Sequence, residues 1–204
     1  MKILCLHGFR HNSALLQKSM GTMMTCFKKA NIEFDFLDSN ISYTSAEPVD
    51  EKANFRQWWS ATKDSVTNLT TFDTIEDSLK TVLKKWDDGK YDGILGFSQG
   101  SVLAQIFAYR IQNGIFKTYA PKFVILCSTF SITDTNEKKM YEKKLDYPCV
   151  IMYGEKDTFV TDELTLQVSA FMANPFLIKH KGGHYVSTTK ETTDSLLEFL
   201  IKFK

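Results

Sequence analysis

The sequence predicts an α/β fold, with a mostly parallel sheet of about six strands and helices on both of its faces. Two observations carry this prediction: short apolar runs are bounded by turn residues, and stretches with helical periodicity separate most of them. The length of 204 residues suits one hydrophobic core, so we expect a single domain over residues 1–204.

Each expected strand is an apolar run of five to seven residues. In chain order, these runs are KILCL (residues 2–6), IEFDFLD (32–38), YDGILGF (91–97), KFVILCS (122–128), YPCVIMY (147–153) and PFLIKH (175–180). Because helical stretches lie between most of them, neighbouring strands should pair in parallel through crossover connections.

The longest connection, residues 40–72, is polar and rich in turn residues, yet it contains Phe55, Trp58 and Trp59. Long connections in compact domains are often lids or binding loops, so we predict a lid-like insertion whose three aromatic side chains bind substrate. The alternative is that the rings anchor the segment to the core. Since adjacent residues point in different directions, we expect one tryptophan to pack inward and the other to face the cleft.

The segment GILGFSQGS places Ser98 between Gly96 and Gly100. It ends an expected strand, and the apolar residues of the following QGSVLAQIFAYRIQN are close to helical spacing. A strand that turns directly into a helix needs a strained residue at the turn and flanking residues without side chains. The pattern is typical of a nucleophile elbow with Ser98 as the nucleophile; the alternative is an ordinary strand, turn and helix.

A nucleophilic serine needs a histidine to take its proton and a carboxylate to orient that histidine. VIMYGEKDTFV supplies the acid at a strand end, where we prefer Asp157 to Glu155 and to Asp162, which is expected to cap the next helix. FLIKHKGGHYVS supplies the base: His184 follows two glycines in a loop, whereas His180 ends an apolar run. Hydrolases whose serine lies on a nucleophile elbow have their three catalytic residues in this chain order: serine, acid, histidine.

Acyl transfer also needs hydrogen-bond donors for the oxyanion that develops on the attacked carbonyl. We predict the backbone N–H groups of Gln99, directly after the nucleophile, and of Phe9, in the loop after the first strand. Arg10 is the alternative to Phe9. His7, which precedes this loop, is predicted to be structural.

The composition argues against several classes of function. A net charge of +1, with acids and bases interspersed, gives no field that attracts nucleic acid, and small uncharged substrates fit it. No apolar run is long enough for a signal peptide or a membrane span. The four cysteines form no C-x-x-C pair and the four histidines lack metal-ligand neighbours. We therefore predict buried free thiols, no metal site, and a cytoplasmic or nuclear location.

The segments LCLHGFRHN, WW, GILGFSQGS, GEKD and GGHYV together resemble the FSH group of small serine hydrolases within the α/β-hydrolases, over residues 2–203. The resemblance implies the α/β-hydrolase fold with a trimmed sheet, a triad of Ser98, Asp157 and His184, no cofactor, and esterase activity on acyl esters. GFSQG also recurs in acyl-protein thioesterases, which commonly have a glycine where this sequence has Ser101.

We therefore predict a serine esterase that cleaves small-molecule carboxylic esters through an acyl-enzyme on Ser98. A thioesterase or peptidase on the same residues is the alternative, because the pocket and not the triad selects the leaving group. A third possibility is a hydrolase-fold binding module that keeps these residues without productive chemistry. The sequence leaves acyl chain length and oligomeric state open.

Overall fold

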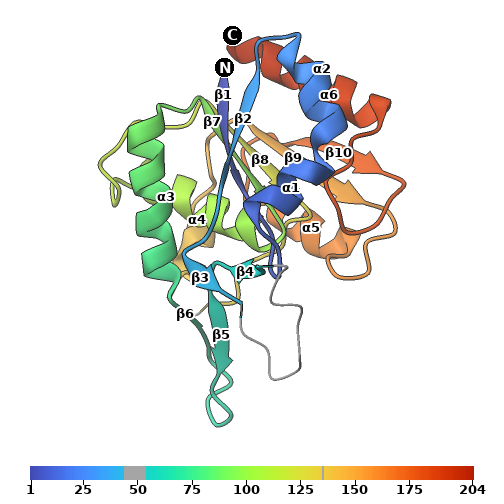
Figure 1. Ribbon diagram of the computed structural model, residues 1–204. Helices are drawn as coiled ribbons and strands as arrows, with labels where there is room; N and C mark the ends of the chain where they lie inside the picture. The colour runs from blue at the N-terminus through green and yellow to red at the C-terminus, as the bar shows by residue number, and fades with distance from the viewer. Residues whose placement is uncertain (44–53, 135) are drawn as a thin grey trace.

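The computed structural model describes residues 1–43, 54–134 and 136–204. Its main sheet has six strands in the order β10-β9-β8-β7-β1-β2, and all neighbouring strands are parallel (Figure 1). The strands are β1 (Lys2–Leu6), β2 (Glu33–Leu37), β7 (Gly93–Phe97), β8 (Phe123–Cys127), β9 (Cys149–Gly154) and β10 (Phe176–His180). The predicted α/β fold with about six strands is confirmed.

Helices cover both faces of this sheet (Figure 1). One layer contains α1 (Ser13–Ser19), α2 (Gly21–Lys28) and α6 (Lys190–Leu200), whose buried residues share one core cluster. The other layer contains α3 (Ile75–Gly89), α4 (Gln99–Gln112) and α5 (Asp162–Ser169), whose buried residues share a second cluster. The described residues also contain two short 3-10 helices, η2 (Lys138–Glu142) and η3 (Ile201–Phe203).

Strand β1 shows how the alternating side chains of the sheet serve both layers. Ile3 and Cys5 belong to the cluster under α1, α2 and α6, whereas Leu4 and Leu6 belong to the cluster under α3, α4 and α5. Successive side chains of a strand point to opposite faces, so one five-residue strand contributes to both cores.

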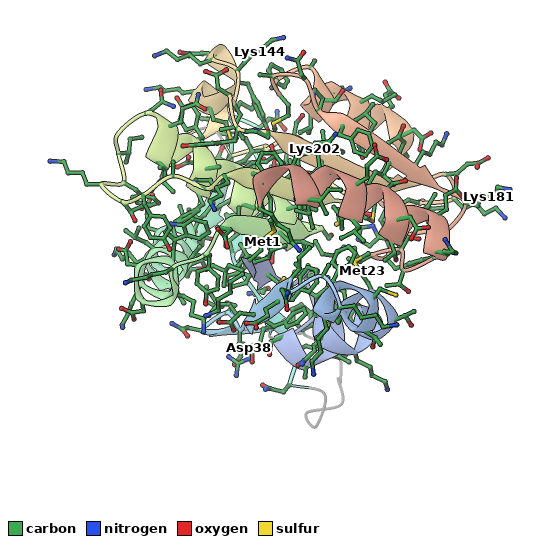
Figure 2. All side chains as sticks on the ribbon, turned by 90° about the horizontal axis from the view of Figure 1, so that it is seen from above. Met1, Met23, Asp38, Lys144, Lys181 and Lys202 are labelled. Carbon is green, nitrogen blue, oxygen red and sulfur yellow. The ribbon has the colours of Figure 1, made fainter. Side chains whose placement is uncertain are left out.

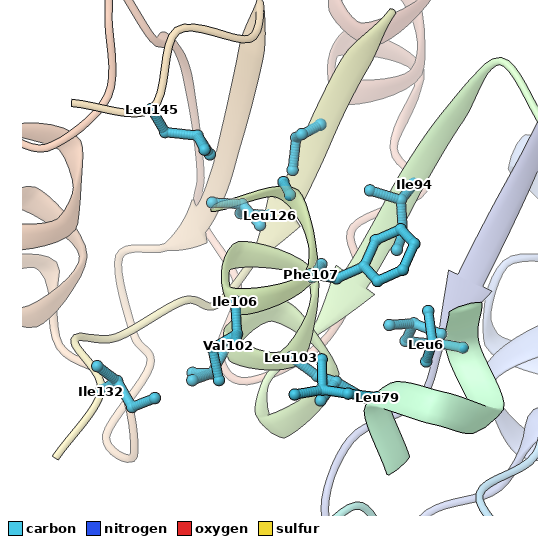
Figure 3. Packing of buried hydrophobic residues seen from close by; sticks show 14 of the residues in the cluster. Leu6, Leu79, Ile94, Val102, Leu103, Ile106, Phe107, Leu126, Ile132 and Leu145 are labelled. Atoms are coloured by element: carbon cyan, nitrogen blue, oxygen red, sulfur yellow. The ribbon is translucent and has the colours of Figure 1, made fainter. Parts of the chain in front are cut away.

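Helix α4 is the central packing element of the second layer, and it buries every residue except Tyr109 and Gln112. Its Phe107 lies beside Ile94 of β7, with Leu103 one turn away on the same helix (Figure 3). A helix that is apolar on nearly all sides is stable only when it is enclosed by other elements. The packing therefore holds the start of α4 at Gln99, and with it the preceding residue, Ser98.

The described part of the 40–72 insertion forms two small antiparallel sheets. In one, β3 (Ile41–Ser42) pairs with β4 (Arg56–Gln57), and in the other, β5 (Ser60–Lys63) pairs with β6 (Thr70–Asp73). The side chains of Trp58, Trp59 and Phe72 are buried in the cluster under α3, α4 and α5. This part of the insertion is thus anchored to the core, and its movement as a lid stays a prediction.

The cysteines follow the expectation with one exception. Cys5, Cys127 and Cys149 are buried, but Cys26 is exposed. Helix α2 buries Met23 and Phe27, so residue 26 falls on the solvent side of the helix and the prediction of a buried thiol there was wrong.

The surface carries many charged side chains; those of Lys144 and Lys181 extend outward from the rim of the molecule (Figure 2). Within the described ranges, none of the helices has the length and apolar character needed to cross a membrane.

Candidate active site

Ser98 lies between the end of β7 and the start of α4. Its backbone has φ 52° and ψ −117°, a conformation that residues with a side chain rarely adopt. The Ser98 N–H donates to the carbonyl oxygen of Cys127 at 2.9 Å, which fixes the turn to the neighbouring strand. The predicted strand, tight turn and helix are all present, and the strain lies at the serine itself.

The two flanking glycines are required by space. A Cβ atom on Gly96 would lie 2.2 Å from the carbonyl oxygen of Gly100, and one on Gly100 would lie 2.4 Å from that of His7. The start of α4 therefore approaches β7 and β1 more closely than any side chain would allow. Ser101 Oγ donates to the carbonyl oxygen of Ser98 at 2.6 Å and so stabilises the first turn of the helix.

His184 connects Ser98 to Asp157. Its Nε2 lies 2.9 Å from Ser98 Oγ and its Nδ1 lies 2.7 Å from Asp157 Oδ2. Asp157 Oδ1 accepts the backbone N–H groups of Phe159 at 3.0 Å and Val160 at 2.8 Å. Burial alone would raise the pKa of Asp157, but the hydrogen bonds from Val160 and His184 outweigh it and hold this pKa below its ordinary value. An ionised Asp157 can therefore accept a hydrogen bond from the N–H at Nδ1 of His184.

The competing carboxylates lie elsewhere. Glu155 follows β9 and is exposed, and Asp162 forms an ion pair with Lys179 at 2.6 Å. Asp162 is the first residue of α5, and the cap is the preceding Thr161, whose side chain accepts the N–H of Leu164. The helix cap is therefore one residue earlier than expected, at Thr161 and not at Asp162.

The competing histidine, His180, ends β10 and is buried. Its Nδ1 accepts the N–H of Gly182 at 3.2 Å, and burial lowers its pKa. His184, two residues beyond that hydrogen-bonded turn, is the histidine that lies beside Ser98.

The loop after β1 passes directly beside Ser98. A Cβ atom on Gly8 would lie 3.3 Å from Ser98 Cβ, so the backbone around residues 8 and 9 is close to the serine. In the described part of the chain, the backbone N–H groups of Phe9 and Gln99 have no acceptor within the protein. Two free donors next to a nucleophile are what an oxyanion hole requires.

Two cavities meet at Ser98 and share Phe9 and Phe130 in their walls. The first, of about 570 Å³, is lined further by residues that include Tyr43, Trp59, Phe72 and Gln99, and we call it the tryptophan cavity. The second, of about 580 Å³, is lined further by Arg10, Phe159, Val160, Leu164 and His184, and we call it the histidine cavity.

Trp58 and Trp59 occupy different positions. Trp58 is fully buried, stacks on His7 with ring centroids 4.8 Å apart, and donates its Nε1–H to the carbonyl oxygen of His7 at 2.8 Å. Trp59 stacks on Phe72 at 4.6 Å and lines the tryptophan cavity. The Gln99 side chain holds both: its Oε1 accepts the N–H of Trp58 at 2.7 Å and its Nε2 donates to the carbonyl oxygen of Trp59 at 2.9 Å.

Phe55 is half-buried and is not one of the described residues that line either cavity. Its ring faces the guanidinium group of Arg10, with Cζ 6.0 Å from the ring centroid. The structure thus places Phe55 beside Arg10 and not in the wall of either cavity.

His7 holds the loop next to Ser98. Its Nδ1 lies 2.8 Å from the carbonyl oxygen of Gly8, and its Nε2 accepts the backbone N–H of Ser39 at 3.2 Å. Burial lowers the pKa of His7 to about 4, so the ring is neutral and Nδ1 carries its single proton.

Sequence reasoning missed the residues that complete the cavity walls. Phe72 is held in place by the buried Asp134, whose Oδ2 accepts the Phe72 N–H at 2.5 Å. The lining residues that were missed come from separate segments of the chain, and their only sequence signal is an aromatic or aliphatic side chain in a polar segment. The unpredicted lining residues include Tyr43, Phe72, Phe130, Phe159 and Leu164.

Other kinds of reactive site find little support in the structure. Among residues 1–43, 54–134 and 136–204, no three His, Cys, Asp or Glu side chains gather so that they could hold a metal ion. Burial raises the pKa of the Cys127 thiol to about 12 and raises the pKa values of the Cys5 and Cys149 thiols above their ordinary range. Protonated thiols are poor nucleophiles, so these three buried cysteines are poor candidates for a catalytic group.

A family model described as "Serine hydrolase (FSH1)" matches residues 1–196 of this chain. The chain belongs to this family of serine hydrolases. The chain is 26% identical over 208 residues to esterase CG5412 of Drosophila melanogaster, a match that covers 98% of this chain and 73% of that protein. It is 27% identical over 218 residues to esterase OVCA2 of Xenopus tropicalis, covering 100% of this chain and 93% of that protein.

Solved structures show the same fold at low sequence identity. SOBER1 of Arabidopsis thaliana superposes with a TM-score of 0.66 at 13% identity, covering 100% of this chain and 98% of SOBER1. Acyl-protein thioesterase 2 of Zea mays superposes with a TM-score of 0.64 at 17% identity, covering 99% of this chain and 93% of that structure. The chain therefore has the α/β-hydrolase fold.

Proposed function

We propose that this FSH1-family hydrolase cleaves carboxylic esters through an acyl-enzyme on Ser98. The observation that carries the proposal is the line of contacts from Asp157 to His184 to Ser98, at 2.7 and 2.9 Å, at the point where two largely apolar cavities meet. A nucleophile hydrogen-bonded to a base, which a third group orients, is the arrangement that covalent acyl transfer needs.

In the proposed mechanism, Ser98 Oγ attacks the ester carbonyl carbon while His184 Nε2 takes the hydroxyl proton. Asp157 stabilises the imidazolium that forms. The backbone N–H groups of Phe9 and Gln99 donate to the carbonyl oxygen as it becomes an oxyanion. The carbon–oxygen bond to the leaving alcohol then breaks, and His184 returns the proton to that oxygen.

Hydrolysis is completed by water. His184 deprotonates a water molecule that attacks the acyl carbon, and the bond from the acyl carbon to Ser98 Oγ breaks as the proton returns to the serine. The products are a carboxylic acid and free enzyme, and the cycle uses no cofactor.

The two cavities hold different parts of the ester. The proton of His184 must reach the leaving oxygen, so the leaving group belongs on the His184 side, in the histidine cavity. The acyl chain then extends into the tryptophan cavity, where Trp59 and Phe72 form an apolar wall. Trp58 does not line the cavity; its Nε1–H donates to the carbonyl oxygen of His7, and it so supports the wall indirectly. Phe55 acts by holding the Arg10 side chain with its ring.

The proposal is tested with Ser98→Ala. We expect the variant to keep its circular dichroism spectrum and melting temperature, to lose ester turnover by several orders of magnitude, and to lose labelling by a fluorophosphonate. Ser65→Ala, which changes an exposed serine of the β5–β6 hairpin, is the matched control and should keep both turnover and labelling. Retained labelling in Ser98→Ala would exclude Ser98 as the nucleophile.

A further inference from the structure

Arg10 lies in the wall of the histidine cavity together with Ser98 and His184, although no step of the proposed mechanism uses its side chain. It immediately follows Phe9, one of the proposed oxyanion donors. Its backbone φ is 52°, in the left-handed region that glycine and asparagine occupy more readily than arginine. A residue type that does not suit its backbone, next to a reacting centre, calls for a reason in its side chain.

The guanidinium group of Arg10 is held by aromatic rings. Its Cζ lies 5.1 Å from the ring centroid of Tyr43 and 6.0 Å from that of Phe55, and Tyr43 is itself packed edge-on against Phe9. Cation–π contacts of this kind restrict a long flexible side chain while its N–H donors stay free. The group is therefore positioned before any ligand arrives.

Arg10 differs in its partners from the two other arginines of the chain. Arg110 makes ion pairs with Glu76 and Glu137, and Arg56 lies 4.0 Å from a carboxylate oxygen of Asp38. In the described ranges, Arg10 has no carboxylate partner; its recorded contacts are the two rings. Arg10 is exposed and held by rings in the wall of a cavity, and it lacks a carboxylate partner among the residues that the structure describes. Such a cation is suited to bind an anionic group of a ligand.

We propose that the histidine cavity accepts leaving groups that carry a carboxylate or a phosphate, and that Arg10 is the specificity-determining residue that contacts this anion. The inference rests on the proposed function, because the leaving group lies in this cavity only if His184 protonates it. It names the substrate class: esters with an apolar acyl part and an anionic alcohol part.

The test uses two matched pairs of esters with the same acyl group. The first compares 4-carboxyphenyl butyrate with 4-carbamoylphenyl butyrate, each corrected for its rate of hydrolysis by hydroxide. The second compares butyryl glycerol 3-phosphate with monobutyryl glycerol. We expect kcat/KM to favour the anionic member of at least one pair by about tenfold, mainly through KM, because the contact exists in both the bound substrate and the transition state.

Variants at Arg10 assign the preference. Arg10→Met should remove it, so that kcat/KM for the anionic member of the pair falls to that for the neutral member, and Arg10→Lys should keep part of it. Arg10→Asn removes the charge with a residue that suits the left-handed backbone, so it separates the loss of charge from any loss of folding. Lys144→Met, which removes an exposed cation at the rim of the molecule, is the control and should keep the full preference (Figure 2).

The outcomes separate the two proposals. If the wild-type protein hydrolyses none of the four esters, the proposed function fails. If it hydrolyses them with no anion preference, or if Arg10→Asn changes both members of each pair equally, only the inference about Arg10 is overturned. A preference within one pair alone supports the inference and identifies the anion as carboxylate or phosphate.

Discussion

The elbow around Ser98 and the wall of the tryptophan cavity are built in different ways. The elbow is a continuous stretch whose shape follows from backbone contacts that exclude any side chain at Gly96 and Gly100. The wall brings together Trp59 and Phe72 from a distant insertion, and the side chains of Gln99 and Asp134 hold its backbone. Changes at the elbow should therefore abolish turnover, whereas changes in the wall should alter stability and the choice of ester.

The largest effect is expected at the base. If His184 takes the proton of Ser98, His184→Ala should lower kcat by nearly as much as Ser98→Ala does, because losses within a triad are not additive. Single-turnover kinetics with a butyrate ester would measure it. His180→Ala is the matched histidine control and should retain most activity, since His180 lies outside the line of contacts to Ser98. The reverse ranking would mean that the base has been assigned to the wrong histidine.

The two tryptophans give the next largest effect. Because both are buried, Trp58→Ala and Trp59→Ala should each cost about 3–5 kcal/mol of unfolding free energy, measured by urea titration. Only Trp59→Ala should also change chain-length selectivity, because only Trp59 lines the cavity. Each methylene that loses apolar cover costs up to about 0.8 kcal/mol, so kcat/KM should fall more steeply from acetyl to decanoyl esters. Identical chain-length profiles in both variants would show that the acyl chain does not occupy this cavity.

A smaller effect should follow from cutting the connection between the elbow and the wall. Gln99→Met leaves the backbone N–H of Trp58 and the carbonyl oxygen of Trp59 unpaired, which should cost about 2 kcal/mol and weaken turnover of long acyl esters. Gln112→Met is the control, because it removes two backbone hydrogen bonds at the far end of α4. It should leave the chain-length profile unchanged; equal profiles for both variants would argue against a positioning role for Gln99.

The effect that should change turnover least concerns the pH dependence of stability. The folded-state pKa of His7, about 4, is below the ordinary histidine value of about 6.5, so the unfolded chain binds more protons in this range. The stabilisation from neutral His7 is present above pH 6.5 and is lost as the pH falls toward 4. His7→Gln should flatten the decline in unfolding free energy by up to about 1.4 kcal/mol per pH unit, as measured by urea titrations at pH 4.5 to 7. An unchanged slope would show that His7 does not control it.

The sequence predicted the parts of the molecule that depend on local pattern. The strand runs and the glycines around Ser98 are local signals, and the six strands and the sharp turn are found where they were expected. The partition of the two tryptophans was predicted in outline, but which of them lines the cavity depends on hydrogen bonds with Gln99, forty or more residues away. The exposure of Cys26 depends on which face α2 presents to the sheet, which its weak amphipathic pattern does not specify.

The all-parallel pairing of the main sheet has a consequence for the order in which the chain gains its activity. Ser98 and His184 are 86 residues apart, and parallel neighbours can join only after a whole crossover has formed. Helical signal can return early in refolding, but if His184 is the base, ester turnover must wait until β10 has joined β9 and carried the His184 loop to the serine. Refolding from urea should therefore show far-ultraviolet ellipticity recovering ahead of hydrolysis. On the ribosome, we expect no ester turnover until the His184 loop has emerged.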